Sequence, residues 1–286
     1  MPRRPSKSKK TIPRPSTTKK GRKKKPPVAQ PTLLIIGDQM LVTEYGDVCG
    51  AHDIDCVEFI TRREDDLAEH PRVVPALPKK LPASTRMVLE LSNLDIEVKR
   101  NNLEFLDRIL PASIPILSTS VTVSATEQSS WLATRNRLVG FAALPGFGKS
   151  HRVEVAPTVF SSSETLEQVS LFFRSLGKET EFVQDCVGMV IPRIVCQIVN
   201  EALLLCQEEV AHPHDVDLAG SIALGSTRGP IAFGARMSLK HVAAVLHALQ
   251  RDLGDPRYHV APILSQLAVS GEWWKRMSAD DSSSHR

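Results

Sequence analysis

The first half of the chain alternates short apolar runs with segments that have helical spacing. The run TLLIIG at 32–37 is apolar, contains β-branched side chains and stops at a glycine, which is typical of a buried parallel strand that ends in a turn. The predicted strands are residues 32–37, 55–60, 86–91, 114–120, 137–143 and 180–185. The predicted helices between them are residues 42–51, 96–110 and 161–177. Because strand, helix and strand recur along the chain, the pattern predicts a doubly wound α/β domain over residues 31–184.

The pattern changes after Gly188, where the short strand-like runs disappear. Residues 190–210, VIPRIVCQIVNEALLLCQEEV, are apolar on most faces but carry enough polar residues to favour a buried helix over a membrane span. Two further helices are expected at 215–225 and 238–254, each ended by a glycine. The sequence therefore predicts a second domain over 185–286 that is entirely helical.

Charge is distributed unevenly along the chain. Residues 1–30 hold 12 Lys or Arg and no Asp or Glu, whereas the rest holds 24 basic and 32 acidic residues, a formal charge of about −8. We expect this proline-containing basic tail to be disordered, because it repels itself and cannot bury apolar area. One hypothesis is that the tail contacts nucleic acid or another polyanion. The other is a solubilising extension, and the lack of aromatic residues that could stack on bases leaves both open.

The composition limits the class of protein. With 286 residues, of which 42% are hydrophobic, the chain can form one or two substantial cores. No apolar run reaches the roughly 18 residues that a membrane helix needs. No apolar segment follows the basic N-terminus as in a secretory signal, so we expect a soluble, cytoplasmic protein without a membrane span. The five cysteines form no C-x-x-C pair, and neither a disulfide framework nor a metal site is predicted.

Several motifs of the second half follow one another in a characteristic order. They are SSETL at 162–166, LGKETEFVQDCVGMVIPRIV at 176–195, NEALLL at 200–205, DVDLAGSIALG at 215–225 and RGPIAFG at 228–234. This order resembles the L-3-hydroxyacyl-CoA dehydrogenase family, which includes the 3-hydroxybutyryl-CoA dehydrogenases. The stretch ELSNLDIEVKRNNLEFLDRILP at 90–111 is also similar to a family segment, and the resemblance covers nearly all of residues 32–271. It implies a Rossmann-like domain that binds NAD, a helical domain through which two copies dimerise, and oxidoreduction of a 3-hydroxyacyl-CoA.

The resemblance also indicates where the catalytic groups of the family should lie. Such enzymes need a general base for the hydroxyl proton, a carboxylate that orients this base, and donors that hold the oxygen. In the stretch GFAALP, Ala142 stands where the family has its catalytic His, while Glu154 matches the orienting carboxylate. Pro192 stands where the family has an Asn that pairs with substrate. The hydroxyl near the reacting oxygen is expected in the stretch STS, which consists of Ser118, Thr119 and Ser120.

The turn that would bind the dinucleotide departs from the family pattern. A G-x-G-x-x-G turn lets backbone amides approach the pyrophosphate. Here the turn reads GDQMLVTEYG, with Gln39 and Val42 at the places of the second and third glycines. Asp38 adds a negative charge where the start of a helix would attract a phosphate. Gly37 and the strand-end Glu90 remain as the candidates for cofactor binding.

Other candidate groups have simpler interpretations. His151 lies three residues before Glu154, so in a strand the two side chains would point to opposite faces. His212 and His214 are interpreted as part of a solvated turn and helix cap, not as metal ligands. The stretch GFGKS at 146–150 lacks the first spacing of a phosphate-binding loop.

Taken together, these patterns predict a family member whose dehydrogenase chemistry is weak or absent and that acts as a binding or regulatory subunit. The clamp for acyl-CoA is expected to be missing, because residues 60–90 are too few for the helical excursion that helps the family hold coenzyme A. Two alternatives stay open. One is an active dehydrogenase that uses relocated groups such as Glu90, Glu154 or His151. The other is an inert dimer tethered to nucleic acid or an anionic surface through residues 1–30.

Deleting residues 1–30 tests the tether hypothesis. The full-length chain is expected to bind a DNA oligonucleotide, whereas the shortened chain is not. A plot of the log affinity of the full-length chain against log salt concentration should have a slope of about −0.9 for each phosphate that is neutralised. Fluorescence anisotropy at several salt concentrations measures the affinity of both chains for the oligonucleotide. A full-length chain with the 12 basic residues of the tail replaced by Gln serves as a control of equal length. Equal binding by these three chains, or binding insensitive to salt, contradicts the hypothesis.

Overall fold

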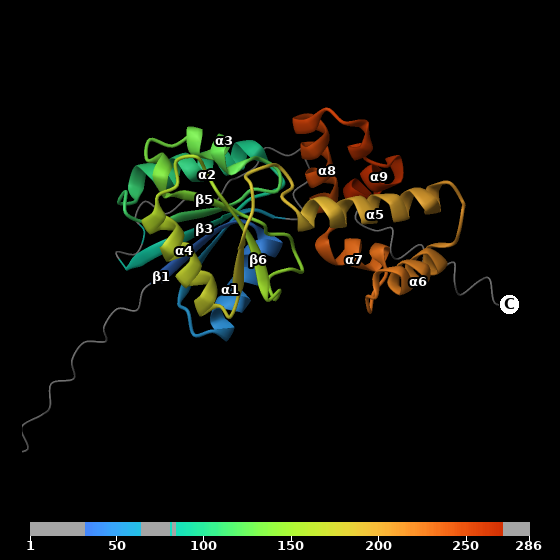
Figure 1. Cartoon of the computed structure of the whole chain (residues 1–286), viewed down its shortest axis with the longest axis horizontal. Helices are drawn as coiled ribbons and strands as arrows, with labels where there is room; N and C mark the ends of the chain where they lie inside the picture. The colour runs from blue at the N-terminus through green and yellow to red at the C-terminus, as the bar shows by residue number, and fades with distance from the viewer. Residues whose placement is uncertain (1–31, 64–80, 82–83, 271–286) are drawn as a thin grey trace, which may run out of the picture.

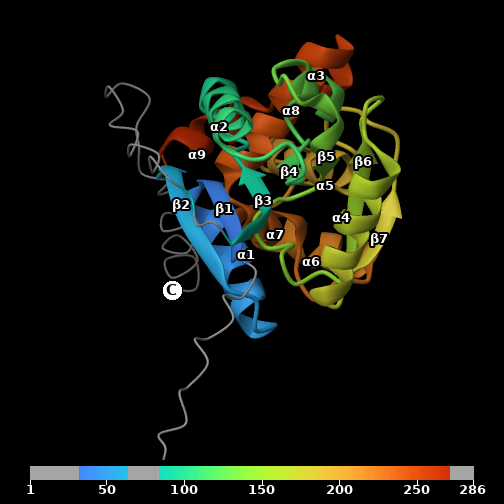
Figure 2. The same ribbon diagram turned by 90° about the vertical axis from the view of Figure 1, so that its left-hand side faces the viewer.

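The computed structural model describes residues 32–63, 81 and 84–270, so the basic segment 1–30 lies outside the described residues. Its central feature is a sheet in the order β2-β1-β3-β4-β5-β6-β7. All neighbouring strands are parallel except β5 and β6, which pair antiparallel. In Figure 2 the strands lie side by side in this order, from β2 on the left to β7 on the right. The strands are β1 (Thr32–Asp38), β2 (Cys56–Arg62), β3 (Thr85–Leu91), β4 (Ile116–Thr119), β5 (Leu138–Phe141), β6 (Arg152–Pro157) and β7 (Glu179–Phe182).

Helices cover both faces of this sheet. They are α1 (Gln39–Ala51), α2 (Ile96–Ile109), α3 (Ala125–Ser130) and α4 (Ser163–Ser175). Leu33 and Ile35 of β1 belong to a core cluster with α1 and α4, whereas Leu34 and Ile36 belong to a cluster with α2 and α3. Because successive side chains of a strand point to opposite faces, this division produces three layers, which are visible in Figure 1. The predicted doubly wound α/β class is therefore confirmed.

The rest of the described chain is helical and lies to the right of the sheet in Figure 1. Its helices are α5 (Ile191–Gln207), α6 (Pro213–Leu224), α7 (Pro230–Met237), α8 (Leu239–Leu253) and α9 (Pro262–Ser270). They share a separate core that includes Val199 and Leu203 of α5 and Val245 and Leu246 of α8. The predicted helical C-terminal region is confirmed. Within the described residues, none of the helices combines the length and hydrophobicity of a membrane span.

Local sequence explains most element boundaries. Asp95 precedes α2 and accepts hydrogen bonds from the amides of Glu97 and Val98, as expected of an N-cap. Arg137 is buried and donates to the carbonyls of Leu106, Leu110 and Pro111, so it satisfies the last turn of the same helix. Helix α2 is therefore closed at both ends by side chains, and its predicted range of 96–110 differs from the observed one by a single residue.

Some elements differ from the prediction. Helix α1 begins at Gln39 and not at residue 42, because β1 passes into it without an intervening loop. The strand β6 and the helices α3, α7 and α9 are missing from the predicted elements. Helix α3 has only six residues and owes its start to Ser124 and to Asp185, which accepts from the amides of Ala125 and Thr126. A helix this short has no detectable apolar period.

Gly37 is required by the backbone at the end of β1. Its φ is +145°, and a Cβ there would lie 2.5 Å from the carbonyl carbon of Leu91 and 2.8 Å from the amide nitrogen of Ser92. We expect Gly37→Ala to lower the free energy of unfolding by about 2–4 kcal/mol, because neither backbone atom can move aside. Gly50 in α1 has no atom within 4 Å of such a Cβ.

Gly50→Ala is therefore the matched control, and it should raise the free energy of unfolding by about 0.5–1 kcal/mol. Urea denaturation followed by circular dichroism measures both variants. Equal effects of the two substitutions would show that the close approach of β1 to β3 does not constrain residue 37.

Candidate functional site

The strand order reverses at β1, which lies between β2 and β3. In open α/β sheets, ligands bind outside the carboxyl ends of the strands at such a reversal. Here the buried side chain of Asp38 ends β1, and its Oδ2 accepts hydrogen bonds from the amides of Asn93 (2.6 Å) and Leu94 (3.1 Å) in the segment after β3. The place where a ligand would be expected is thus bridged by a carboxylate of the protein itself.

The burial of Asp38 makes ionisation of its carboxyl group less favourable. Burial raises the pKa of this carboxyl above its ordinary value, while the charge of His241 on α8 and the two amides act in the opposite direction. The second oxygen, Oδ1, is buried and has no hydrogen-bond partner in the described part of the chain. A phosphate at this position would meet this fully buried carboxyl group.

Glu90 belongs to a buried polar cluster next to this turn. Its side chain is fully buried and forms an ion pair with Lys99 of α2. Ser118 donates to Glu90 (2.9 Å), and the Lys99 ammonium also donates to Ser118 Oγ and Thr119 Oγ1, both at 3.0 Å. Burial lowers the pKa of Lys99, and Glu90 opposes this shift. The structure therefore brings Glu90, Ser118 and Thr119 together around Lys99, but Ser118 donates to Glu90 and Thr119 donates to Asn93 (2.6 Å), so their hydrogen bonds stay within the protein.

Ser120 lies at the edge of this cluster. Its hydroxyl donates weakly to the carbonyl of Ser118 and accepts from Gln128, both at 3.4 Å. It also lies 2.4 Å from where a Cβ on Gly140 would be, so β5 approaches it closely. The three hydroxyls of the stretch STS are all buried, and Ser120 is separate from the ion pair of Glu90 and Lys99.

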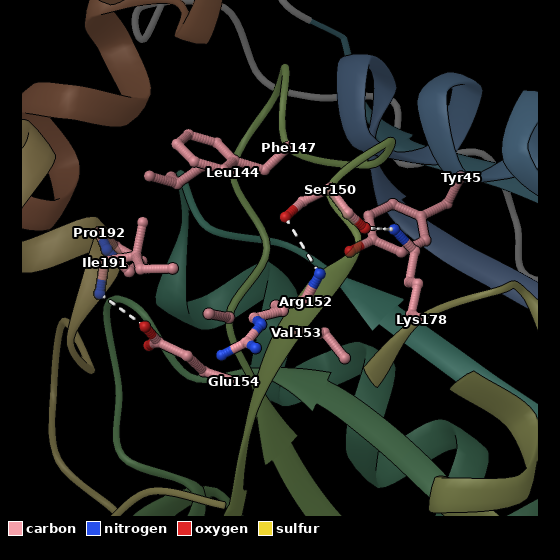
Figure 3. A pocket seen from close by; sticks show the side chains of 11 residues that line it. Tyr45, Leu144, Phe147, Ser150, Arg152, Val153, Glu154, Lys178, Ile191 and Pro192 are labelled. Carbon is pink, nitrogen blue, oxygen red and sulfur yellow. Dashed lines mark hydrogen bonds between the residues drawn. The ribbon is translucent and has the colours of Figure 1, made fainter. Parts of the chain in front are cut away.

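Ala142, Glu154 and Pro192 line one small cavity, which Figure 3 shows from close by. The cavity holds about 30 Å³, room for about one water molecule. No histidine is among its lining residues in the described part of the chain. Glu154 points at the start of α5, where its two carboxylate oxygens accept from the amides of Val190 (2.9 Å) and Ile191 (2.7 Å). A carboxylate at this end of a helix is favoured by the helix dipole, so Glu154 acts as a cap for α5.

The corner after Ala142 is held by a residue that sequence reasoning misses. Glu44 of α1 accepts hydrogen bonds from the amides of Gly146 and Gly148, both at 2.7 Å. Lys178 donates to the carbonyls of Gly148 and Ser150, both at 2.6 Å. The glycine-rich stretch at 146–150 thus binds an anionic group, but that group is a carboxylate of the same chain. Glu44 lies 102 positions before Gly146 in the sequence, and no local pattern indicates that the two are in contact.

The histidines considered from the sequence lie apart from these groups. His151 is exposed and precedes β6, and Glu154 is directed to α5 and not to this imidazole. His212 is the residue before α6, and both His212 and His214 are exposed. Across the residues that the structure describes, no group of three or more His, Cys, Asp or Glu side chains could hold a metal ion.

Known proteins resemble this chain in sequence and in structure. The C-terminal domain of 3-hydroxyacyl-CoA dehydrogenases matches residues 188–278. The chain is 24% identical over 186 residues to the 3-hydroxybutyryl-CoA dehydrogenase of Clostridioides difficile, and the aligned region covers 65% of this chain and 66% of that protein. It is 25% identical over 185 residues to the probable 3-hydroxybutyryl-CoA dehydrogenase of Bacillus subtilis, and this aligned region covers 65% of this chain and 64% of that protein. The chain thus spans slightly less than two thirds of the length of these relatives.

A solved structure has the same fold. The (S)-3-hydroxybutyryl-CoA dehydrogenase of Ralstonia eutropha superposes with a TM-score of 0.66 at 19% identity, over 85% of this chain and 95% of that chain. At this level of identity the likeness concerns the arrangement of the sheet and the helices.

Replacing Glu154 separates a structural from a chemical role for this carboxylate. Glu154→Ala leaves two amides at the start of α5 without their acceptor, and we expect the free energy of unfolding to fall by about 1–3 kcal/mol. Glu154→Gln keeps one acceptor oxygen, so it should lower the free energy of unfolding by less than Glu154→Ala. The exposed Glu167 of α4 provides the control, since Glu167→Ala should stay within about 0.5 kcal/mol of the wild type. Urea denaturation measures the series, and a Glu154→Ala variant as stable as the control would exclude the capping role.

Proposed function

We propose that the chain belongs to the 3-hydroxyacyl-CoA dehydrogenase family and has the fold of these enzymes without their hydride-transfer chemistry. On this proposal, the protein acts as a binding or regulatory subunit. The observation that carries this proposal is the cavity around Ala142. Ala142, Glu154 and Pro192, the three positions of the expected catalytic groups, line it together, but the described residues of its lining include no imidazole that could accept a proton. Loss of a general base alone costs about 10² to 10⁴ in rate.

The state of Glu154 supports the same conclusion. In the family this position is expected to orient the base. Here both oxygens of the carboxylate accept hydrogen bonds from backbone amides of α5, which leaves the group committed to the helix. Pro192 in the first turn of that helix has no amide side chain with which to pair a substrate oxygen.

The residues at the expected NAD site do not fit a dinucleotide. A pyrophosphate needs free backbone amides and a turn without side chains. At the end of β1 the buried Asp38 carboxyl bridges to the amides of Asn93 and Leu94, and of the three glycine positions of the G-x-G-x-x-G pattern this chain keeps the first, Gly37. We therefore expect the chain not to bind this coenzyme.

A homodimer formed through the helical region is part of the proposal. Helix α6 exposes three large apolar side chains, Leu218, Ile222 and Leu224, of which Ile222 is 73% exposed. Exposed apolar groups gathered on one helix favour contact with another protein surface. A second copy of the chain is the partner that the family resemblance suggests.

Turnover by the purified chain tests this function. Mixed with acetoacetyl-CoA and NADH, it should oxidise NADH at a rate at least about 100-fold below the 1–10³ s⁻¹ that is typical of enzymes. NADH should also leave the melting temperature unchanged, because a ligand that does not bind the folded state cannot stabilise it. The 3-hydroxybutyryl-CoA dehydrogenase of Clostridioides difficile is the positive control for the assay.

Steady oxidation at ordinary enzyme rates would end the proposal in favour of a dehydrogenase with relocated groups. In that event Glu90→Gln, Glu154→Gln and His151→Gln identify the group involved by their separate effects on the rate.

A further inference from the structure

Strand β7 forms one edge of the sheet and lies at its right-hand side in Figure 2. The amides of Glu179 and Val183 donate to carbonyls on the β6 side at 2.8 and 2.9 Å, so alternate residues of β7 bond to β6. Thr180 and Phe182 therefore direct their amides and carbonyls away from the sheet. These backbone groups have no hydrogen-bond partner among the described residues. The outer side of β7 can thus accept a further strand.

The side chains of β7 divide between the two faces of the sheet. Phe182 is in register with Val155 of β6, which belongs to the core cluster on the side of α1 and α4. Thr180 lies on that side as well, because the side chains of a strand alternate. Glu179 and Glu181 lie on the opposite face, where their side chains are 74% and 51% exposed. The edge of the sheet therefore presents two carboxylates on one face and a hydroxyl and an aromatic ring on the other.

The two carboxylates share a single cation. Arg152 donates from Nη1 to Glu181 at 2.9 Å, and its Nε lies 3.5 Å from a carboxylate oxygen of Glu179. One guanidinium beside two carboxylates leaves a net negative charge on this face. Because all three side chains are half exposed or more, these pairs contribute little, and the carboxylates stay open to another cation. This face of β7 favours a neighbouring strand with basic side chains at every second position.

The face toward α4 favours small polar side chains. A cavity of about 400 Å³ lies there, and its lining includes Ser170 and Arg174 of α4 together with Thr180 of β7. Arg174 is exposed, so it would repel a basic side chain of an added strand, whereas a hydroxyl could accept a hydrogen bond from it. An added strand that suits both faces therefore alternates basic and small polar residues.

One stretch of the basic tail has this alternation. Residues 6–9 read SKSK, so that Lys7 and Lys9 are separated by Ser8. Most other basic residues of the tail stand directly next to one another, and in a strand they would carry their charges to both faces. Residues 6–12 contain no proline, so each of them can donate its amide to a neighbouring strand.

The tail is long enough to reach this edge. It joins the sheet at β1, and four strands separate β1 from β7. Neighbouring strands lie about 4.8 Å apart, so the distance across the sheet is about 24 Å. Residues 10–31 can span up to about 75 Å when they are extended. A tethered segment meets its site at a high effective concentration, which allows a contact of a few residues to form.

A second copy of β7 is a less suitable partner for the same edge. In an antiparallel pair of two such strands, the outward-facing residues 180 and 182 would bond to each other across the interface. The two copies of Glu181 would then lie directly opposite one another. Like charges in this position destabilise a sheet. The charge of the edge therefore favours the tail over a second β7.

We propose that residues 6–9 of the N-terminal tail bind as an added strand to the outer edge of β7 of the same chain. The two lysines of this stretch lie opposite the two glutamates of β7, and Ser8 lies in the cavity beside Arg174. The tail thereby has a partner within the protein, with which a polyanion would have to compete. This inference goes beyond the proposed function and involves no group of the expected catalytic or cofactor sites.

Amide hydrogen exchange of the full-length chain, followed by NMR, tests this contact. The amides of Thr180 and Phe182 should exchange at least about threefold more slowly in the wild type than in a chain with Lys7→Glu and Lys9→Glu, because like charges would then face each other. These substitutions lie outside the described fold, so a loss of structure in β7 does not explain the change. A chain with Lys19→Glu and Lys20→Glu changes the net charge equally and is the matched control, which should exchange like the wild type.

Reversing the charges on both strands gives a second test. Glu179→Lys combined with Glu181→Lys should abolish the slow exchange of the outward-facing amides. Adding Lys7→Glu and Lys9→Glu to that chain should restore it, because opposite charges face each other again. A general effect of net charge does not produce such a rescue.

Equal exchange in the wild type and in the chain with Lys7→Glu and Lys9→Glu would overturn the inference, as would a failure of the combined chain to recover slow exchange. Slow exchange that appears only as the protein concentration rises would overturn it in favour of contact between two copies. Slow exchange that is independent of concentration and restored by the double reversal supports it. Turnover of acetoacetyl-CoA is a separate measurement, so the contact and the proposed function can fail independently.

Discussion

The structure depends on how the carboxylates buried at the carboxyl edge of the sheet obtain hydrogen-bond donors. Leaving an ionised carboxylate buried without donors costs several kcal/mol. Asp38 obtains two backbone amides, Glu90 obtains the ammonium of Lys99, and Glu154 obtains the first amides of α5. In each case the donor belongs to another element, so each carboxylate joins two parts of the fold. Groups that a catalytic cleft would direct toward a ligand are directed toward the chain itself.

Much of the fold could be predicted from the sequence because its main elements carry strong local signals. The apolar run of β1 and the amphipathic pattern of α2 identify these elements before any tertiary contact is known. The start of α1 could not be placed in the same way. Strand β1 passes into this helix without a loop, and the side chain of Asp38 at its N-cap bonds to the segment after β3 and not to the helix. Helix α3 depends on Asp185, which lies about 60 positions away and leaves no trace in the local pattern.

The candidate site was predictable only in part. The resemblance identifies Ala142, Glu154 and Pro192, and the structure brings these three positions to one cavity. The resemblance does not indicate that Glu154 caps a helix, because this role depends on the path of the chain between β7 and α5. The cavity of about 400 Å³ between the sheet and the helical region has no sequence motif, because three of its lining residues, Arg62, Thr122 and Arg251, come from distant segments. Nothing in the spacing of such residues shows that the chain brings them together.

The contact of Glu44 with the loop at 146–150 has a mechanical consequence. Phe147 in this loop packs against the core of the helical region, with its ring 5.5 Å from that of Phe233 on α7. A carboxylate of α1 thereby fixes a loop whose aromatic tip is anchored in the other domain. This loop therefore couples the two domains mechanically, because it is bonded to α1 at one point and packed into the helical core at another. A change in the spacing of the two domains would have to break the hydrogen bonds of Glu44 or withdraw Phe147 from the helical core.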